Sequence, residues 1–419
     1  MKKEFDNFLF NSTVDKEKYF IAKYLIKSNN MLKAAKGVAI GQSIGNPDVR
    51  LDNETTELLE NHLSIILDHP DNLKNKKEAI VRIAFPIKNF DLEQDGITQL
   101  ICTFMGGQMD IEEILGCRLL DVEFPNIFLK NFKGPKIGLD EIRKRTNSIR
   151  RPLLGGIVKP KTGLDIETLK DVCIKMVRGG VDFIKEDEIL GNPSCCPFEE
   201  RVKIVNDVVQ NEASKLNKEV FYAPCVNSDL PYLIKRIEFL VKNKMKAYHL
   251  NIWTGLQTYK YLRSFDFDIA MFYQKSGDRV ITDKNNVYSI SWNVLLKLAR
   301  ISGADFIHAG MWGGYLSDTK EDLTNWLSIL TSKNDLNFKK TVPSFSCGSH
   351  PGLVQTTVKN FGIDIMMSLG GSMHGHPSGT LSGAKAMRQA FDLLFQKSPN
   401  KSALKEYNEA IEKWGFIDD

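Results

Sequence analysis

The segment Gly179–Glu188, with the sequence GGVDFIKEDE, joins a short apolar run directly to four charged residues. The run Val181–Ile184 has the length, and the β-branched and aromatic content, of a buried strand. Alternation along such a strand places Lys185 and Asp187 on one face. A buried strand that ends in charged side chains is typical of the carboxyl end of a strand in a parallel α/β sheet, where catalytic residues gather. This segment therefore predicts an α/β fold with a site at one end of its strands.

Seven further runs of this kind lie between residues 153 and 371, and stretches of helical periodicity separate them. The eight predicted strands are Leu153–Val158, Val181–Ile184, Val220–Val226, Ala247–Trp253, Asp268–Tyr273, Ala304–Gly310, Thr341–Gly348 and Asp364–Gly371. Eight strands that alternate with helices favour a closed (β/α)8 TIM barrel. The alternative is an open, doubly wound sheet, but no dinucleotide-binding glycine pattern follows the first strand, and polar residues follow many strands.

The first part of the chain, residues 1–138, is predicted to form a separate, small α+β domain of the ferredoxin-like type, ahead of a catalytic barrel domain at residues 139–419. Its predicted strands are Tyr19–Ile26, Glu78–Phe85 and Gly116–Phe124, and its predicted helices are Leu32–Ile40 and Gly96–Phe104. The stretch Phe132–Arg151, FKGPKIGLDEIRKRTNSIRR, is interpreted as a linker that leads into the barrel.

The composition argues against a polyanionic partner and against an oxidising compartment. The 419 residues include 56 Lys and Arg against 52 Asp and Glu, a net charge of +4, so neither nucleic acid nor a membrane surface is an expected partner. The seven cysteines form no Cys-x-x-Cys pair and are odd in number, which favours a reducing compartment. The start MKKEFDNFLF lacks the apolar core of a signal peptide, and no run approaches the roughly 18 to 20 apolar residues of a membrane span. We therefore expect a cytoplasmic protein.

Charged residues follow the first two predicted barrel strands. Lys159 and Lys161 share a face at the end of the first strand, where they could bind phosphate, polarise a carbonyl group or transfer a proton, or could simply be solvated. After the second strand, the carboxylates of Asp187 and Glu188 suit Mg²⁺, which takes carboxylate, water and substrate oxygens. Lys185 is out of place in a cation site unless it forms an ion pair or is converted to an anion.

The last three predicted strands end in a histidine and several glycines. Alternation from Phe306 turns His308 inward at the end of the sixth strand. The loops after the seventh and eighth strands are the usual phosphate site of this fold, because glycines there let backbone N–H groups approach an anion. The predicted phosphate cradle consists of Gly348, Gly370 and Gly371. His374 and His376 have a spacing that could chelate a metal, but no carboxylate lies near them in sequence, so a structural role is preferred.

Five motifs in this order, RPLLGGIVKPKTGL, GGVDFIKEDE, GADFIHAG, FSCGSHPG and SLGGSMHGHPSG, resemble the large subunit of ribulose-bisphosphate carboxylase (RuBisCO). The resemblance covers nearly the whole chain, because a small α+β domain precedes the barrel in that family as well. It implies that Lys185 takes up CO₂ as a carbamate and holds Mg²⁺ together with Asp187 and Glu188. Lys159 and Lys185 would be the catalytic residues, with Lys159 matching the acid/base lysine and either Lys159 or the Lys185 carbamate moving the proton. The implied substrate-binding and phosphate-binding residues are Lys161, His308, Ser346, Gly348, Gly370 and Gly371.

Several positions depart from the pattern of that family. They are Gly41, Asn46 and Pro47 in the N-terminal domain, Gly107 in place of an asparagine that helps to hold metal-bound CO₂, Asp268 and Ile269 in place of a His-Arg pair at the end of the fifth strand, Phe272 in place of a histidine, and Tyr315 in place of the mobile-loop lysine. Without the lysine and the asparagine, the charge that develops during CO₂ capture has no preorganised partner. Without the arginine, a second phosphate loses a bidentate partner.

The resemblance and its departures together imply a RuBisCO-like protein of the form IV group rather than a true carboxylase. The expected function is Mg²⁺-dependent formation of an enolate or enediolate from a phosphorylated keto sugar or oxo sugar acid, with enolisation, isomerisation or decarboxylation as open outcomes. The alternatives are ribulose-bisphosphate carboxylase and a non-catalytic sugar-phosphate-binding protein on the same fold. The family also implies a homodimer, possibly a higher assembly, with the active site at the subunit interface. The diverged positions expected near the distal end of the substrate are Gln42, Asn46, Gly107, Phe272, Trp312 and Tyr315.

Overall fold

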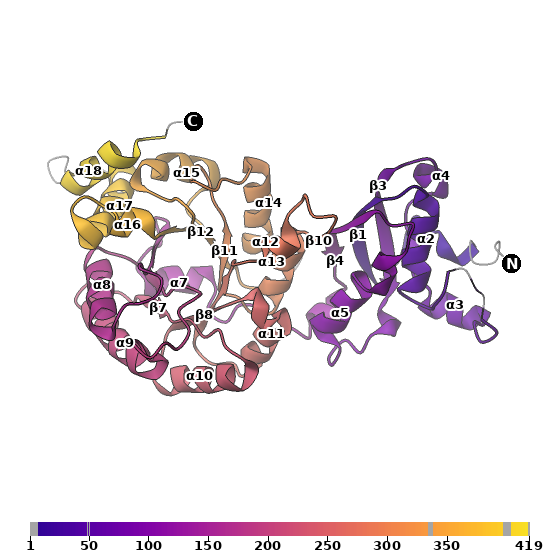
Figure 1. Cartoon of the computed structure of the whole chain (residues 1–419), viewed down its shortest axis with the longest axis horizontal. Coiled ribbons are helices and arrows are strands. Elements are labelled where there is room, and N and C mark those ends of the chain that lie inside the picture. The colour runs from indigo at the N-terminus through magenta and orange to yellow at the C-terminus, as the bar shows by residue number, and fades with distance from the viewer. Residues whose placement is uncertain (1–6, 48, 50, 334–337, 397–403, 418–419) are drawn as a thin grey trace. The chain divides into compact units, whose positions relative to one another are not determined.

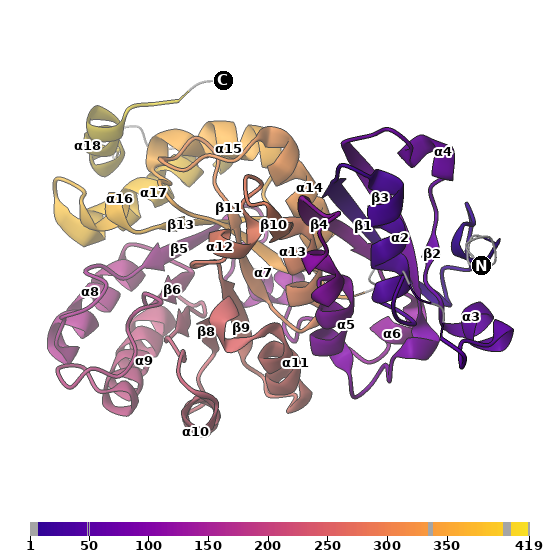
Figure 2. The ribbon, with the colours of Figure 1, turned by 45° about the vertical axis from the view of Figure 1, so that its right-hand side comes forward.

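The computed structural model describes residues 7–47, 49, 51–333, 338–396 and 404–417. They form two compact units, which we describe separately (Figure 1 and Figure 2). The first unit contains the residues up to Lys133 together with Gly277–Leu298, and the second contains Gly134–Ser276 together with the residues from Ala299 onward. The assignment of Gly277–Leu298 to the first unit was not expected, and the division into functional domains at residue 138 stays a prediction. None of the helices in the described ranges is long and apolar enough to cross a membrane.

The first unit is built on a five-stranded sheet in the order β10-β4-β1-β3-β2. Its strands are β1 (Tyr19–Lys27), β2 (Ile65–Ile66), β3 (Glu78–Pro86), β4 (Gly116–Glu123) and β10 (Tyr288–Ile290). Strand β1 runs antiparallel to both β3 and β4, whereas β10 pairs in parallel with β4. The helices of this unit are α2 (Met31–Gly41), α3 (Thr56–His62), α4 (Pro70–Leu73), α5 (Gly96–Phe104), α6 (Asn126–Leu129) and α12 (Arg279–Thr282), with 3-10 turns η1 (Ile87–Asn89) and η2 (Gly107–Asp110). Phe20 of β1 lies in edge contact with the rings of Phe104 and Phe128, so α5 and α6 pack on one face of the sheet.

The second unit is a closed parallel barrel with the strand order β7-β6-β5-β13-β12-β11-β9-β8. Its strands are β5 (Leu153–Ile157), β6 (Phe183–Lys185), β7 (Phe221–Ala223), β8 (Ala247–Asn251), β9 (Ala270–Gln274), β11 (Phe306–Gly310), β12 (Val342–Phe345) and β13 (Met366–Leu369). The two ends of this order meet, because Val226 N donates to His249 O at 3.1 Å and His249 N donates to Pro224 O at 3.0 Å. All eight predicted strands are found, and the prediction of a (β/α)8 barrel is confirmed.

Helices cover the outside of the barrel, as the ring of α8, α9, α10 and α11 in Figure 1 shows. The helices and 3-10 turns of the second unit are α8 (Ile166–Arg178), α9 (Phe198–Ser214), α10 (Leu230–Lys242), η3 (Ile252–Thr254), α11 (Leu256–Ser264), α14 (Lys320–Thr331), η4 (Pro351–Leu353), α15 (Val354–Phe361), α16 (Gly371–His374), α17 (Gly379–Phe395) and α18 (Lys405–Trp414). Helix α13 (Trp292–Ile301) belongs to the first unit up to Leu298 and to the second from Ala299. Helix α8 illustrates why these segments fold this way, since it buries Leu169, Cys173 and Met176 on one stripe. The Asp165 carboxylate caps its first turn by accepting from Thr168 N at 2.7 Å.

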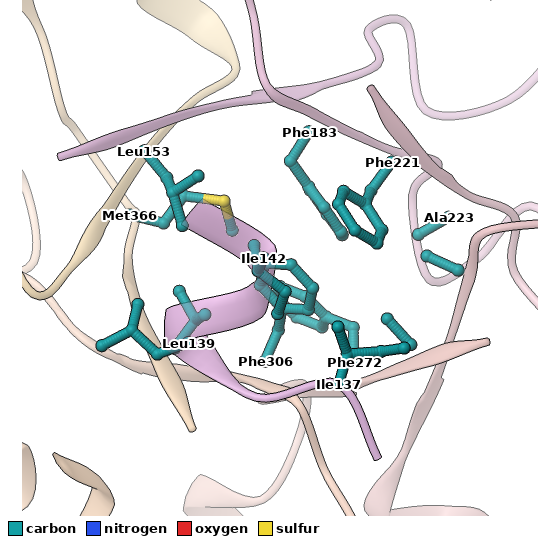
Figure 3. Close-up of a cluster of buried hydrophobic side chains, with 13 residues drawn as sticks. Ile137, Leu139, Ile142, Leu153, Phe183, Phe221, Ala223, Phe272, Phe306 and Met366 are labelled. Atoms are coloured by element: carbon teal, nitrogen blue, oxygen red, sulfur yellow. The ribbon is translucent and has the colours of Figure 1, made fainter. Parts of the chain in front are cut away.

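A short helix, α7 (Leu139–Arg145), closes the amino end of the barrel. Its Leu139 and Ile142, together with Ile137, pack against Phe183 and other inward-facing residues of the strands, as Figure 3 shows. The buried Asp305 carboxylate fixes this segment by accepting from Ile137 N at 2.6 Å and from Gly138 N at 2.8 Å. The interpretation of Phe132–Arg151 as a linker is therefore wrong. Its residues Ile137, Leu139 and Ile142 are part of the core, at the end of the barrel opposite the carboxyl ends of the strands.

Candidate active site

One cavity of about 500 Å³ lies at the carboxyl ends of the barrel strands. It is lined by all ten residues that the sequence analysis selected for the site: Lys159, Lys161, Lys185, Asp187, Glu188, His308, Ser346, Gly348, Gly370 and Gly371. These residues come from strands β5, β6, β11, β12 and β13 or from the loops after them. The structure thus brings the selected residues together, whereas their individual roles stay predictions.

The Lys185 side chain is nearly fully enclosed in this cavity, with only 3% of its surface exposed. Its Nζ donates to Glu186 O at 2.9 Å and to the Glu188 carboxylate at 3.4 Å. Burial lowers the pKa of the Lys185 ammonium, and the charges of Glu188 and Asp187 oppose this effect only in part. The pKa of Glu188 is lowered despite its burial, because the Lys185 ammonium and the Ser276 hydroxyl stabilise the carboxylate. The neutral amine therefore forms more readily here than in a solvated lysine.

Both lysines of the β5 end face the same carboxylate. Lys159 Nζ forms an ion pair with Asp187 Oδ2 at 2.6 Å, and Lys161 Nζ lies 4.0 Å from Asp187 Oδ1. Asp187 is almost fully buried, so this ion pair is much less screened by solvent than a surface pair. The pairing orients Lys159 across the cavity toward β6, so Lys159 is not a purely solvated loop residue, whereas Lys161 is about half exposed, with 53% of its side chain accessible.

A buried ion pair behind the β6 end holds the charged triplet in place. Glu186 points away from the cavity, and its carboxylate accepts from Arg201 Nε at 2.9 Å and from Cys225 N at 2.9 Å. The Tyr222 hydroxyl donates to the same carboxylate. Arg201 also donates to Cys196 O at 2.8 Å and thereby ties down the loop after β6. Sequence reasoning missed this pair, because Arg201 is just one of several charged residues on a helix of otherwise ordinary amphipathic pattern.

The opposite wall of the cavity is formed by the ends of β11 and β12. His308 Nε2 and Ser346 Oγ share a hydrogen bond of 2.7 Å, and Cys347 Sγ lies 3.9 Å from the same nitrogen. Burial, reinforced by the charges of Lys275 and Lys185, lowers the pKa of His308 to about 3. The imidazole is therefore neutral at physiological pH and can donate or accept a hydrogen bond.

The predicted phosphate cradle is formed by glycines at two neighbouring loops. Gly370 directly precedes α16, and a Cβ at this position would lie 3.3 Å from Lys159 Cε, so the Lys159 side chain runs directly beside the cradle. Gly348 has a φ of +122°, and a Cβ there would lie 2.6 Å from Tyr315 N. Glycine is required at that position both for its backbone conformation and for the close approach of the loop after β11. His374 donates from Nε2 to Ile157 O at 2.9 Å, which joins α16 to the end of β5.

The diverged positions do not all lie where the sequence analysis placed them. Asp268 and Ile269 precede β9 instead of ending it, and Asp268 forms a surface ion pair with Arg145. Phe272 belongs to the apolar barrel core, with its side chain below the cavity. The placement of these three residues at the carboxyl end of the fifth barrel strand was wrong. The apolar run in the sequence begins before Ala270, where the hydrogen-bonded strand β9 starts. The residues at the carboxyl end of β9 that line the cavity are Gln274 and Lys275. A cation is therefore retained on this side, although lysine cannot replace the bidentate geometry of arginine.

The remaining diverged residues fall in two places. Tyr315 lines the cavity from the loop after β11, as expected. Trp312 lies on the same loop, but its Nε1 donates to Thr356 Oγ1 at 3.1 Å and it is not a lining residue. The positions of the N-terminal segment, Gly41, Gln42, Asn46, Pro47 and Gly107, belong to the first unit.

A divalent cation would find only part of a coordination sphere in the side chains as they stand. In the described ranges, no group of three or more His, Cys, Asp or Glu side chains is arranged to hold a metal ion. Asp187 and Glu188 provide two carboxylates, and Lys185 Nζ lies between them and the buried backbone. Conversion of this amine to an anionic carbamate would supply a third oxygen ligand, so the residues fit Mg²⁺ on that condition.

Comparison with known proteins agrees with this architecture along the whole chain. The sequence profile of the ribulose bisphosphate carboxylase large chain, catalytic domain, matches residues 138–414, and that of its N-terminal domain matches residues 8–128. A ribulose bisphosphate carboxylase of Archaeoglobus fulgidus is 30% identical over 360 residues, which cover 81% of each chain. A 2,3-diketo-5-methylthiopentyl-1-phosphate enolase of Geobacillus kaustophilus is 30% identical over 415 residues, 95% of this chain and 98% of the enolase.

Solved structures show the same relationship. The octameric RuBisCO of Pyrococcus horikoshii superposes with a TM-score of 0.89 at 25% identity, over 99% of this chain and 98% of that one. A RuBisCO-like protein of Alicyclobacillus acidocaldarius superposes with a TM-score of 0.83 at 25% identity, over 96% of this chain and all of the other. Since both domain profiles match, and since the barrel carries the expected residues in one cavity, the chain belongs to the ribulose bisphosphate carboxylase large-chain family.

Proposed function

We propose that the protein is a RuBisCO-like enzyme that forms an enolate or enediolate from a phosphorylated keto sugar or oxo sugar acid, without fixing CO₂. The observation that carries this proposal is the buried Lys185, which contacts Glu188 and shares one cavity with Asp187 and the glycine cradle. Enolisation needs a base near the α-carbon and stabilisation of a developing oxyanion. Both requirements can be met by groups at the ends of β5 and β6.

Mg²⁺ would be held by Asp187, Glu188 and Lys185, the last as its CO₂ carbamate. The lowered pKa of Lys185 supports this assignment, because only the neutral amine reacts with CO₂. When bound, the ion would act as a Lewis acid that polarises the carbonyl oxygen of the substrate. No other cofactor is required by the residues of the cavity.

The remaining residues would bind the substrate and move its proton. Lys159, held 2.6 Å from Asp187, or the Lys185 carbamate would exchange a proton with the α-carbon of the substrate. The backbone N–H groups of Gly348, Gly370 and Gly371, with Lys161, would bind the phosphate. The neutral pair of His308 and Ser346 would bind hydroxyl or carbonyl oxygens of the substrate.

Exchange of the α-proton tests this proposal directly. The protein is incubated in D₂O with Mg²⁺, bicarbonate and 2,3-diketo-5-methylthiopentyl-1-phosphate, the substrate named for the Geobacillus relative, or with ribulose bisphosphate. We expect NMR to detect deuterium incorporation with at least one of them. In Lys185→Ala, both deuterium incorporation and Mg²⁺ binding, measured by calorimetry, should be lost. Lys175→Ala, on the outer helix α8, is the matched control and should behave as wild type. Full exchange in Lys185→Ala would refute the mechanism.

A second candidate is true carboxylation, which the 30% identity to the archaeal carboxylases favours. Against it stands Tyr315, an aromatic residue on the cavity loop where carboxylation calls for a cation. Incorporation of ¹⁴CO₂ from ribulose bisphosphate would establish this second function. A purely binding protein, by contrast, would bind phosphorylated ligands with no exchange, and it would have little use for the buried Lys185, Asp187 and Glu188 together.

We further propose that the protein works as a homodimer or a larger assembly, in which the N-terminal domain of a neighbouring subunit completes the site. The assembly of the Pyrococcus relative, described as octameric, supports this expectation. Sedimentation equilibrium at the concentrations used for the exchange assay tests it, and a fully active monomer would contradict it.

A further inference from the structure

The last helix of the described chain, α18, delivers a residue to the cavity that the sequence analysis did not select. Trp414, at the carboxyl end of this helix, is one of the lining residues of the cavity. It is partly buried, unlike the following residues Gly415 and Phe416, which are exposed. An aromatic side chain thereby reaches the cavity.

Helix α18 is fastened to the loop that carries the glycine cradle. His376 Nε2 donates to Glu406 O at 2.9 Å, while its Nδ1 accepts from Ser378 N at 3.1 Å. The Ser378 hydroxyl donates to Glu409 Oε2 at 2.7 Å. Lys413 Nζ donates to Gly375 O, at the end of α16, at 2.6 Å. His376, which the sequence analysis left without a firm role, is thus a link between the cradle loop and the C-terminal helix.

A second contact fastens the same segment to the loop after β12. A Cβ on Gly352 would overlap with the carbonyl group of Gly415, so the two backbones touch at this point. Directly beyond it, Ile417 N donates to Gly352 O at 3.2 Å. Trp414 therefore lies between two anchored residues of the chain. Lys413 is held by the loop after β13, and Ile417 is held by the loop after β12, and these two loops supply the cradle glycines. Its position is fixed by the fold, as the position of a binding residue has to be.

The chemistry of tryptophan restricts what this residue can do. The face of an indole ring carries negative charge density, so it repels a phosphate and attracts C–H groups. Its single N–H is a donor only. The positive charge of Lys413, whose Nζ lies 5.2 Å from the ring centroid, is already engaged with the ring and with Gly375. The ring is suited to cover the carbon chain next to a bound phosphate and to exclude water from it.

We propose that Trp414 is a specificity-determining residue that packs on the carbon atom bearing the phosphate group, so that the site prefers a primary phosphoester to free phosphate. This inference rests on the proposed function, because it takes the glycine cradle as the phosphate site. It gives helix α18 a role in selecting the substrate, in addition to the roles proposed for the glycine cradle and for Lys185, Asp187 and Glu188.

Calorimetry with two simple probes tests the proposal without relying on turnover. The affinities of dihydroxyacetone phosphate and of inorganic phosphate are measured for the wild type, Trp414→Ala, Trp414→Phe and Trp253→Ala. Trp253 is 61% exposed on η3 and lies outside the cavity lining, so it is the matched control. We expect the ratio of the two affinities to fall about fourfold in Trp414→Ala, since burial of one CH₂ group is worth roughly that factor. It should fall less than twofold in Trp414→Phe and stay unchanged in Trp253→Ala.

The outcomes separate this inference from the proposed function. If the wild type binds neither probe, the phosphate cradle itself is wrong and both proposals fail. If the wild type binds both probes and the ratio is unchanged in Trp414→Ala, only the role of Trp414 is refuted. A loss of both affinities by the same factor would also refute it, since the ring would then support the cradle instead of the carbon chain. Thermal unfolding of each variant monitors the fold, and Trp414→Leu replaces Trp414→Ala if the latter does not fold.

Discussion

The two walls of the cavity differ in how firmly their side chains are held. At the end of β6, Lys185, Glu186 and Asp187 are all nearly fully buried, and each charged group has a partner on another segment or in the backbone. At the ends of β11 and β12, by contrast, Tyr315 is 80% exposed, and Cys347 adopts a φ of +80° that costs energy for any residue with a side chain. Both walls carry residues that match the family's motifs, but Tyr315, a key departure, lies on the second.

This difference suggests where the family can change its chemistry. A buried charge network tolerates no single substitution, because removal of one member leaves the others desolvated and unpaired. A loop residue such as Tyr315 has few constraints beyond its backbone, so its side chain is free to follow the substrate. On this view the β6 wall preserves the enolising step, and the β11–β12 wall decides what happens to the enolate.

The largest effect is expected from breaking the network behind β6. Arg201→Met leaves the Glu186 carboxylate buried and without its ion-pair partner, so the free energy of unfolding should fall by about 3–5 kcal/mol. Mg²⁺ binding should weaken as well, because Glu186 lies between Lys185 and Asp187 in the chain. Urea denaturation and calorimetry measure the two quantities.

The double variant Glu186→Gln/Arg201→Met is the matched control, because it removes both charges. It should recover at least about 2 kcal/mol of the loss, since no uncompensated charge remains in the core. A double variant that is as unstable as Arg201→Met would mean that packing, and not the buried charge, dominates this wall.

The sequence alone predicts the barrel and the residues that line the cavity, but it does not predict the contacts that hold them in place. The eight strands and the cavity residues follow from short apolar runs with polar ends, because strand alternation and barrel geometry are local rules. The core helix α7 was mistaken for a linker, because its apolar residues Leu139 and Ile142 acquire meaning only when the barrel beneath them exists. Arg201 and Trp414 were missed for the same reason. Each reaches the site through contacts between segments far apart in the chain.

A smaller effect is expected from His308 on the second wall, which should make the free energy of unfolding depend on pH. The folded state holds the pKa of His308 at about 3, below its usual value of about 6.5. The unfolded chain therefore binds this proton first as the pH falls, and stability is lost progressively from about pH 6.5 downward. Between pH 7 and pH 5 the loss from His308 amounts to about 2 kcal/mol at most.

Urea denaturation of the wild type and of His308→Gln at both pH values measures this contribution. The variant should lose about 2 kcal/mol less than the wild type over the interval, whatever its stability at pH 7. An identical pH dependence in wild type and His308→Gln would show that His308 is accessible to protons in the folded protein.

A still smaller effect on stability is expected at Cys347, where relief of backbone strain should raise the free energy of unfolding. Its left-handed conformation costs a residue with a Cβ about 1–2 kcal/mol, whereas glycine adopts it freely but loses about 0.5–1 kcal/mol more entropy on folding. Cys347→Gly should therefore be more stable than Cys347→Ala by about 0.5–1 kcal/mol, although both remove the thiol. Urea denaturation of the two variants side by side checks this, and equal stabilities would mean that the turn is not strained.

The smallest effect on stability should come from Tyr315→Lys, which restores the cation of the carboxylating pattern. Because the Tyr315 side chain is largely in solvent, the free energy of unfolding should change by less than about 0.5 kcal/mol. Proton exchange should also stay within about threefold, since the groups that would perform it lie at the ends of β5 and β6. We nevertheless expect no ¹⁴CO₂ incorporation from ribulose bisphosphate. A cation stabilises a developing charge only when the surrounding donors are preorganised for it, and the second phosphate would still meet Lys275 in place of a bidentate arginine. Carboxylation by this single variant would overturn the division of labour between the two walls, because one loop residue would then suffice to redirect the enolate.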